Sequence, residues 1–251
     1  MKNKQHRELA VCGFEAVKAL ADMHPERIQR LFFTQENARF FGSTCKMLAA
    51  ARKIYRCVES PEELEKLSQS VHHQGVVAMI DEPTIPILDF SALRGWFANK
   101  ERILVLDRVG NANNLGAIVR SAAFFGIRKV VIGADDAQAQ ITTSAYRVAE
   151  GGMEHVEMWR APSAAWIVQG SARKMVRIGA DHRASRTLAD LGSLSGPELG
   201  LMIVMGNEEF GLSPEVTESC DHLVRIPGSG AIESLNVAQA ATLFLYGISL
   251  L

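Results

Sequence analysis

The chain has 251 residues, of which 47% are hydrophobic and 22% charged, so it can bury a sizeable core in one large domain or two modest ones. Its 27 lysines and arginines and 28 aspartates and glutamates give a net charge of −1, so any contact with nucleic acid must come from local patches. No run of 18 or more apolar residues is present, so we expect no transmembrane helix and no membrane partner.

The start of the chain and its cysteines favour a cytoplasmic protein. Residues 1–11 are mostly polar and charged with no apolar stretch behind them, so no secretory signal is expected. The cysteines Cys12, Cys45, Cys57 and Cys220 lie far apart, without a CxxC pair or a histidine at metal-ligand spacing. We therefore expect reduced thiols, no metal site and a cytoplasmic location.

Residues 7–82 have the pattern of a small α/β unit. One helix is marked at its start by Ser60 as the N-cap, Pro61 at the first helical position and Glu63 three residues after the cap. The expected elements are a helix over 13–22 ended by Pro25, a strand over 28–34, a helix over 41–53 opened by Ser43 or Thr44, a strand over 53–59, a helix over 60–69 and a strand over 75–80.

The remainder of the chain predicts a second domain with a parallel sheet. Residues 83–101 contain two prolines and mixed polarity, which indicates a linker with a short helix. We therefore divide the chain into domains over 1–82 and 102–251, because strands and helices alternate after residue 102. The strands are expected over 103–106, 129–133, 155–159, 175–180, 201–205 and 222–226, and the helices over 115–125, 142–148 and 163–172, after Ser213 and from about Leu235.

The first of three polar loops follows the strand over 103–106. It has only Gly110 and Gly116 where a dinucleotide-binding fold needs GxGxxG, which argues against a nicotinamide-dependent dehydrogenase. Asn114 precedes the predicted helix and is a good N-cap, which is the simplest interpretation of that residue. Arg120 has apolar sequence neighbours on nearly all sides, and a buried arginine must be paired or functional because an isolated buried charge costs several kcal/mol.

Two further loops follow strands in the same way, at the edge where ligands bind open α/β sheets. In the first, over 203–213, Gly206 would let the backbone approach a ligand, and Glu208 offers a carboxylate. In the second, over 225–236, Ser234 or Asn236 could cap the last helix or bind a ligand. Either loop taken alone could equally be a surface turn.

Together, NLGAIVRSAAFFG, IVMGNEEFGLS and IPGSGAIESLNVAQA resemble the signature motifs of the SpoU/TrmH family of RNA ribose 2′-O-methyltransferases, within the SPOUT superfamily. VCGFEAVKAL, PERIQRLFFT and HHQGVVAMI resemble the RNA substrate-binding domain, related to a ribosomal protein fold, that precedes the catalytic domain in many members. The resemblance implies methyl transfer from S-adenosylmethionine to a ribose 2′-hydroxyl in tRNA or rRNA. It also implies a trefoil knot that binds the methyl donor, and a homodimer through the catalytic domain with the active site at the subunit interface.

Matched residue by residue, the motifs assign roles to particular side chains. The catalytic set is Arg120, Asn114, Glu208, Ser234 and Asn236, and the cofactor-binding set is Met205, Gly206, Ile226, Pro227, Ser234 and Leu235. From the basic residues of the first domain we expect RNA contacts at Arg27, Arg30, Arg52, Lys53 and Arg56, although such residues more often form a solvated face. One departure from the family pattern is Ala238, where the motif usually has serine.

Two other function classes remain as alternatives. An RNA-binding or chaperone protein could keep the fold without transferring methyl groups, but the presence of Arg120, Glu208 and Asn236 argues against it. A different α/β enzyme acting with a nicotinamide cofactor or on a phosphorylated substrate would need a GxGxxG loop or a P-loop lysine, and both are absent. The sequence does not identify the target nucleotide.

Overall fold

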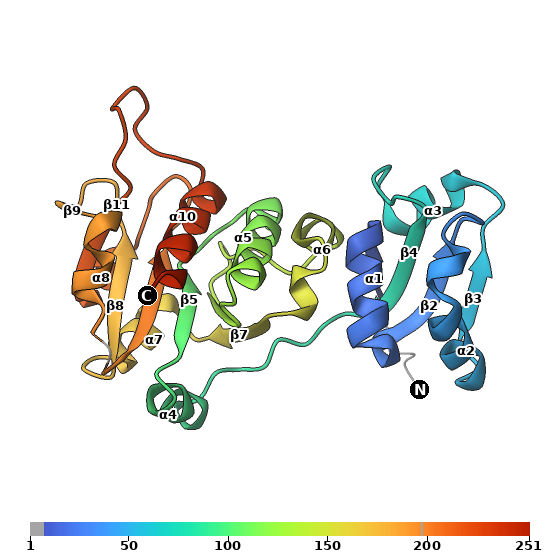
Figure 1. Ribbon diagram of the computed structural model, residues 1–251, viewed down its shortest axis with the longest axis horizontal. Helices are drawn as coiled ribbons and strands as arrows, with labels where there is room; N and C mark the ends of the chain where they lie inside the picture. Colours follow the sequence, from blue (N-terminus) through green and yellow to red (C-terminus); the bar gives the residue numbers. More distant parts are fainter. Residues whose placement is uncertain (1–7, 197) are drawn as a thin grey trace. The chain divides into compact units, whose positions relative to one another are not determined.

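The structure is a computed structural model that describes residues 8–196 and 198–251, so most of the polar start of the chain lies outside the described residues. The chain folds into two compact units (Figure 1). Residues 8–84 and 141–155 form the N-terminal unit, and residues 85–140 and 156–251 form the C-terminal unit. Within these ranges, no helix has the length and apolar character needed to cross a membrane.

The N-terminal unit contains a four-stranded sheet in the order β1-β4-β2-β3. β4 pairs antiparallel with both β1 and β2, while β2 and β3 are parallel. The sequence did not lead us to expect β1. The elements in chain order are β1 (Glu8–Cys12), α1 (Phe14–Met23), β2 (Ile28–Phe33), α2 (Gly42–Ala50), β3 (Ile54–Cys57), α3 (Pro61–Ser68) and β4 (Val76–Asp81), with short 3₁₀ helices over Pro25–Arg27 and Ala38–Phe40.

The predicted helix starts in this unit are close to the observed ones. α3 begins at Pro61 after Ser60, as expected, but the Ser60 side chain makes no capping hydrogen bond. Glu63 instead accepts a hydrogen bond from the backbone N–H of Glu59 at 3.1 Å. α2 begins at Gly42, so the expected opening at Ser43 or Thr44 is wrong by one or two residues.

Residues 141–155 join the N-terminal unit although they lie between two strands of the other unit in the sequence. They form α6 (Thr143–Ala149) and a 3₁₀ helix over Gly152–Glu154, and α6 packs against β1. Arg27 binds this segment through Glu154, at 2.5 Å, and through the Tyr146 hydroxyl, at 2.7 Å. The chain therefore passes between the units three times, and the division at residues 82 and 102 stays a prediction.

The C-terminal unit contains a seven-stranded sheet in the order β7-β6-β5-β10-β8-β11-β9. All of its strand pairs are parallel, so the predicted α/β class with a parallel sheet is confirmed. The strands are β5 (Arg102–Leu106), β6 (Lys129–Gly133), β7 (Glu157–Ala161), β8 (Met175–Ala180), β9 (Arg186–Thr187), β10 (Gly200–Met205) and β11 (His222–Arg225). The central strands β5 and β10 are almost continuously apolar, as expected for a sheet covered on both faces.

Helices cover the two faces of this sheet (Figure 1). On one face, α4 (Phe90–Ala98), α7 (Ala164–Gly170) and α9 (Pro214–Ser219) share a core with Ile103 and Val204. Strand side chains alternate between faces, so Leu104 and Ile203 point to the opposite face. There α5 (Ala112–Phe124) packs against α10 (Val237–Ser249), while α8 (Leu191–Leu194), preceded by a 3₁₀ helix over Leu188–Asp190, also contacts α10. α4 lies inside the predicted linker and contributes Leu93 and Trp96 to the core.

Candidate active site

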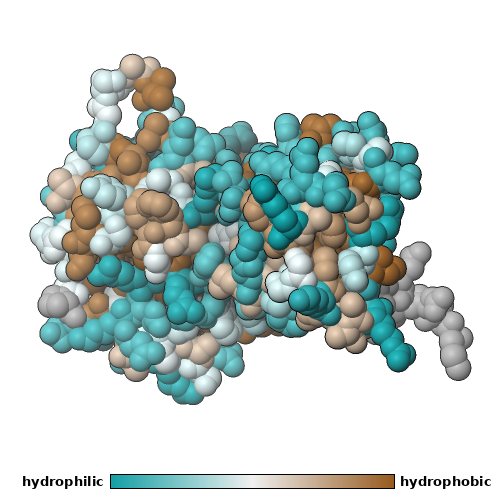
Figure 2. All heavy atoms as spheres, turned by 45° about the vertical axis from the view of Figure 1, so that its right-hand side comes forward, coloured by the Kyte–Doolittle hydropathy of each residue, from teal (hydrophilic) through white to brown (hydrophobic). Residues whose placement is uncertain are grey.

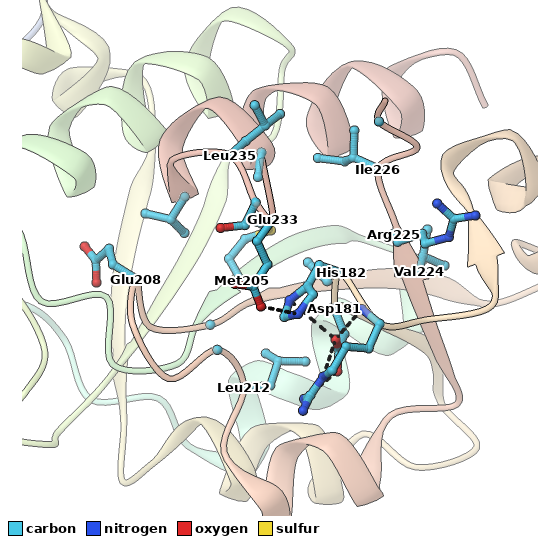
Figure 3. A pocket seen from close by; sticks show the side chains of 18 of the residues that line it. Asp181, His182, Met205, Glu208, Leu212, Val224, Arg225, Ile226, Glu233 and Leu235 are labelled. Carbon is cyan, nitrogen blue, oxygen red and sulfur yellow. Dashed lines mark hydrogen bonds and ion pairs between the residues drawn. The ribbon is translucent and has the colours of Figure 1, made fainter. Parts of the chain in front are cut away.

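The C-terminal unit has a pocket of about 780 Å³ at the carboxyl ends of β8, β10 and β11 (Figure 3). The loops that follow these three parallel strands form its wall, which is where ligands bind in open α/β sheets. All members of the predicted cofactor-binding set line this pocket: Met205, Gly206, Ile226, Pro227, Ser234 and Leu235. Residues separated by about thirty positions in the sequence are thus brought to one cavity.

The loop after β10 is a tight turn that needs Gly206. Asn207 and Gly211 exchange backbone hydrogen bonds of 2.9 and 3.0 Å, so the loop folds back on itself. A Cβ atom on Gly206 would overlap the backbone of Gly211 and Leu212. Gly206 therefore permits a close approach of the chain to itself, and its expected approach to a ligand stays a prediction.

We expect Gly206→Ala to lower the free energy of unfolding by about 2 to 3 kcal/mol, because backbone atoms cannot move aside as a flexible side chain can. The same change should remove binding of any ligand in the pocket. Thermal unfolding followed by circular dichroism measures the first effect. Gly228→Ala is the matched control, since Gly228 also lines the pocket but has open space at its Cβ position. Equal stability of the two variants would contradict this account.

A hydrogen-bond network joins the three polar loops at one edge of the pocket. Asn114 donates from Nδ2 to Glu208 Oε1 at 2.8 Å, and Asn236 donates from Nδ2 to Asn114 Oδ1 at 3.1 Å. Asn114 is free to do this because the N-cap of α5 is Asn111, whose Oδ1 accepts from the backbone N–H groups of Asn113 and Asn114. The predicted N-cap role of Asn114 is therefore wrong.

Glu208 ties the first loop to the second. Its carboxylate also accepts hydrogen bonds from the backbone N–H groups of Gly110 and Asn111, at 3.1 and 3.2 Å. Burial raises the pKa of Glu208, but the hydrogen bonds from Asn114 and Gly110 outweigh burial and hold the pKa below its ordinary value. An ionised carboxylate whose oxygens accept three hydrogen bonds is suited to fixing loop geometry rather than to accepting a proton.

Asn236 fills one of the roles that the sequence left open, the cap of α10, and its role in ligand binding stays a prediction. It is the N-cap of α10, accepting from the backbone N–H of Ala238 at 2.9 Å, and it also joins the network. Ala238, where serine is usual, is buried in the first turn of α10. The replacement of serine by alanine therefore leaves the cap in place.

Arg120 lies on α5, near the middle of the helix. It is exposed on α5 and does not line the pocket, so the expected apolar surroundings are wrong. Its apolar neighbours Ile118, Val119 and Ala122 turn inward on the helix and leave Arg120 on the outer face. A role in catalysis then requires that the RNA or a second subunit bring Arg120 to a pocket.

Most of the basic side chains expected to bind RNA already have protein partners. Arg27 binds Glu154 and Tyr146, and Arg30 binds Glu8. Lys53 donates to the backbone carbonyls of Glu26 and Ile28, and Arg56 binds Glu63. Arg52 is exposed after the end of α2 and has no such partner among the residues that the structure describes. Arg52 is thus the member of the set best placed to meet a phosphate.

The pocket also contains charged residues that the sequence analysis overlooked or left without a role. Asp181, His182 and Arg183 follow β8 directly, and Glu233 lies on the loop between β11 and α10. Their position at a strand end was the available signal. Among residues 8–196 and 198–251, no cluster of three or more His, Cys, Asp or Glu side chains could hold a metal ion. All four cysteines are free, and burial raises the pKa of Cys220 to about 12.

Two segments of the chain match known families. Residues 101–246 match the SpoU rRNA Methylase family, and residues 10–86 match a domain described as RNA 2′-O ribose methyltransferase substrate binding. The 23S rRNA (guanosine-2′-O-)-methyltransferase RlmB of Acinetobacter baylyi is 34% identical, over 93% of this chain and 94% of that protein. RlmB of Coxiella burnetii is also 34% identical, over 95% and 94%.

Solved structures share the fold along nearly the whole chain. The AdoMet-bound rRNA methyltransferase from Sinorhizobium meliloti has a TM-score of 0.74 at 20% identity, covering 96% of this chain and 86% of that one. The SpoU methyltransferase AviRb from Streptomyces viridochromogenes, in complex with AdoMet, has a TM-score of 0.70 at 21% identity, covering 96% and 89%. At these identities the likeness concerns the fold alone.

Proposed function

The chain belongs to the SpoU rRNA methylase family, and we propose that it transfers a methyl group from S-adenosylmethionine to a ribose 2′-hydroxyl of 23S ribosomal RNA. The observation that carries the proposal is that the second and third motif loops line one pocket, while Asn114 ties the first motif loop to them through Glu208 and Asn236. The guanosine named for the two RlmB relatives is the proposed target base. Ribosomal RNA as substrate and free thiols support a cytoplasmic location.

The pocket suits the methyl donor in size and in lining. Its volume of about 780 Å³ falls within the range usual for small-molecule sites. Leu212, Val224 and Phe244 supply apolar walls, while Asp181 and Glu233 supply carboxylates. An apolar wall suits the adenine ring, and carboxylates suit the positive charge of the sulfonium and amino groups. The cofactor-binding set assigned from the motifs would thus hold the donor.

Methyl transfer requires the protein to orient the ribose 2′-hydroxyl and to stabilise the negative charge that develops on its oxygen. When bound, S-adenosylmethionine supplies a methyl group on a positively charged sulfur, and the ribose 2′-oxygen takes this group as the carbon–sulfur bond breaks and the hydroxyl proton leaves. Arg120 is normally locked in its protonated form, so we assign it to orienting the hydroxyl and stabilising negative charge on the oxygen. Asn114, Ser234 and Asn236 position the reacting groups.

We include a homodimer through the C-terminal unit in the proposal. Arg120 does not line the pocket of its own chain, so a partner's pocket is the natural place for it. Exposed apolar side chains lie on the same two helices: Phe124 of α5 is 82% exposed and Tyr246 of α10 is 51% exposed. Burial of such a patch is typical of a subunit interface. The trefoil knot is part of the same proposal and rests on family membership.

The proposed RNA contacts in the N-terminal unit are best tested at Arg52. Arg52→Ala should weaken RNA binding and lower the slope of log affinity against log salt by about 1, because one phosphate contact is lost. Fluorescence anisotropy with labelled rRNA at several salt concentrations measures both. Lys66→Ala, an exposed cation outside the predicted set, is the control. An unchanged slope in Arg52→Ala would remove Arg52 from the interface.

Point variants test RNA binding by the N-terminal unit better than removal of the first domain does. Deleting residues 1–82 would take away the surface on which Tyr146, Ala145 and Ala149 are buried. The truncated chain would therefore expose an apolar segment, and loss of activity would not separate RNA binding from misfolding.

Transfer of labelled methyl to RNA tests the proposed function. We expect label from S-adenosylmethionine to enter unmodified 23S rRNA and to survive alkaline hydrolysis in a dinucleotide, since a 2′-O-methyl group blocks cleavage. Bulk unmodified tRNA, assayed separately, should stay unlabelled. Label in tRNA alone would show that the substrate is tRNA and not 23S rRNA. No label in either RNA would favour an RNA-binding protein without methyl transfer.

A further inference from the structure

The end of β8 places a fixed carboxylate inside the pocket. Asp181 accepts hydrogen bonds from the backbone N–H of Arg183 at 2.8 Å and from its Nε and Nη2 at 3.2 and 3.1 Å. Burial raises the pKa of Asp181, but these hydrogen bonds outweigh burial and leave the pKa below its ordinary value. Asp181 is therefore a stable negative charge next to His182.

His182 lies between this carboxylate and a second one from another loop (Figure 3). Its Nδ1 atom is 3.9 Å from Asp181 Oδ1, and its Nε2 atom is 3.2 Å from Glu233 Oε1. Glu233 belongs to the β11–α10 loop, residues 226–236, which lines the pocket through Ile226, Ser234 and Leu235. His182 thus connects the floor of the pocket at β8 with the loop that forms another wall.

The β11–α10 loop has little regular structure to hold it in place. Residues 227–236 are all exposed, and Figure 2 shows hydrophobic side chains at the tip of the projecting loop, at the upper left. Side-chain contacts tie the loop to neighbouring elements at two of its described residues, Asn236 and Glu233. Asn236 binds Asn114 at the base of the loop, and Glu233 binds His182 further along it. The second link decides how closely the middle of the loop stays at the pocket.

We propose that His182 is a positioning residue that holds the β11–α10 loop on the pocket through Glu233 and thereby retains bound S-adenosylmethionine. The inference rests on the proposed function, because it takes the methyl donor as the ligand of this pocket. His182 Nε2 lies within hydrogen-bonding distance of Glu233, whereas His182 Nδ1, at 3.9 Å, is too far from Asp181 for a hydrogen bond. The other charged residues that line the same pocket are Arg183, Glu208, Glu209 and Arg225.

Release of the methyl donor should therefore be faster when the contact between His182 and Glu233 is removed. The His182 and Glu233 side chains are 46% and 81% exposed, which makes the pair a weak one. We expect release to be about two- to fivefold faster without the pair, the range of an exposed ion pair.

A chase of labelled S-adenosylmethionine from the full-length protein measures this rate. His182→Ala and Glu233→Ala should each release the donor faster than wild type. The double variant should be no faster than either single one, because both changes remove the same contact. His182→Lys, which keeps a donor that can reach Glu233, should restore slow release. His72→Ala, at an exposed histidine of the N-terminal unit, is the control.

The outcomes separate this inference from the function on which it rests. Release from His182→Ala and Glu233→Ala at the wild-type rate would overturn the role of His182 and leave the proposed function standing. Additive effects in the double variant would also overturn it, since the two residues would then act separately. No binding of labelled donor by the wild-type protein would overturn both proposals.

Discussion

Arg120→Ala lowers kcat/KM for methyl transfer by about 10²- to 10³-fold, the loss expected when one group that stabilises developing charge is removed. Binding of S-adenosylmethionine stays within about twofold of wild type, because the assigned role of Arg120 is directed at the RNA hydroxyl and not at the donor. This split between binding and transfer is the signature of a residue that acts on the RNA hydroxyl. Single-turnover transfer to 23S rRNA, with donor affinity measured by calorimetry, checks both values.

Two further variants sharpen the test of Arg120. Arg120→Lys keeps the charge but loses the planar fork of donors, so it should restore only part of the rate. Arg128→Ala removes another exposed arginine, beyond the end of α5, and should leave transfer unchanged. Near-normal turnover in Arg120→Ala, with folding unchanged, would show that the assigned role is wrong.

Arg27→Met lowers the free energy of unfolding by about 3 kcal/mol, because it leaves the Glu154 carboxylate buried without its charge partner. The Glu154 side chain is 1% exposed, while that of Arg27 is 33% exposed. Glu154 Oε2 is paired with Arg27, while Glu154 Oε1 is buried without a hydrogen bond. Urea unfolding followed by circular dichroism measures the loss. The result would make Arg27 a residue that stabilises the packing of residues 141–155.

The effect of Arg27→Met should grow with pH. Burial raises the pKa of Glu154 above its ordinary value of 4.5, and the positive charge of Arg27 opposes that rise. A carboxyl group with a raised pKa in the folded state contributes stability below its unfolded pKa and loses it as the pH rises through the folded pKa. Removing Arg27 raises the folded pKa further, so the variant falls further behind wild type as the pH rises through the folded pKa of Glu154 in the wild type.

Arg30→Met is the matched comparison for Arg27→Met. Arg30 pairs with Glu8, and their side chains are 32% and 27% exposed, so removal of Arg30 should cost less than about 1 kcal/mol. Equal losses in the two variants would contradict the importance of burial at Glu154. Weaker RNA binding in Arg27→Met at conditions where the protein stays folded would instead support the original RNA-binding assignment of Arg27.

The strand-and-loop organisation of the C-terminal unit could be predicted from sequence. Apolar runs such as 201–205 followed by polar loops predict parallel strands with a ligand site at their carboxyl ends, and the pocket lies there. The strand pattern alone could not indicate that Asn114 and Asn236, which are 122 positions apart in sequence, belong to one site. That expectation also required the family motifs. Local periodicity describes neighbours along one element, and it carries no information about which loops meet.

Other features lay beyond sequence reasoning for physical reasons. β1 has five residues, too few for a clear alternation, and its partner β4 is distant in the sequence. The α5 helix begins three residues before Leu115 because Asn111 rather than Asn114 caps it, and both asparagines are good caps. The packing of residues 141–155 with the N-terminal unit involves contacts between residues far apart in the sequence, such as the ion pair of Arg27 with Glu154.

Hydrogen–deuterium exchange with and without S-adenosylmethionine tests most directly that the pocket binds the methyl donor. We predict slower exchange in three segments, 180–183, 205–212 and 224–237, which form the pocket wall after β8, β10 and β11. Residues 28–33 of β2 in the N-terminal unit serve as an internal reference and should not change. Unchanged exchange in all three segments at saturating donor, or protection confined to other parts of the chain, would contradict the account.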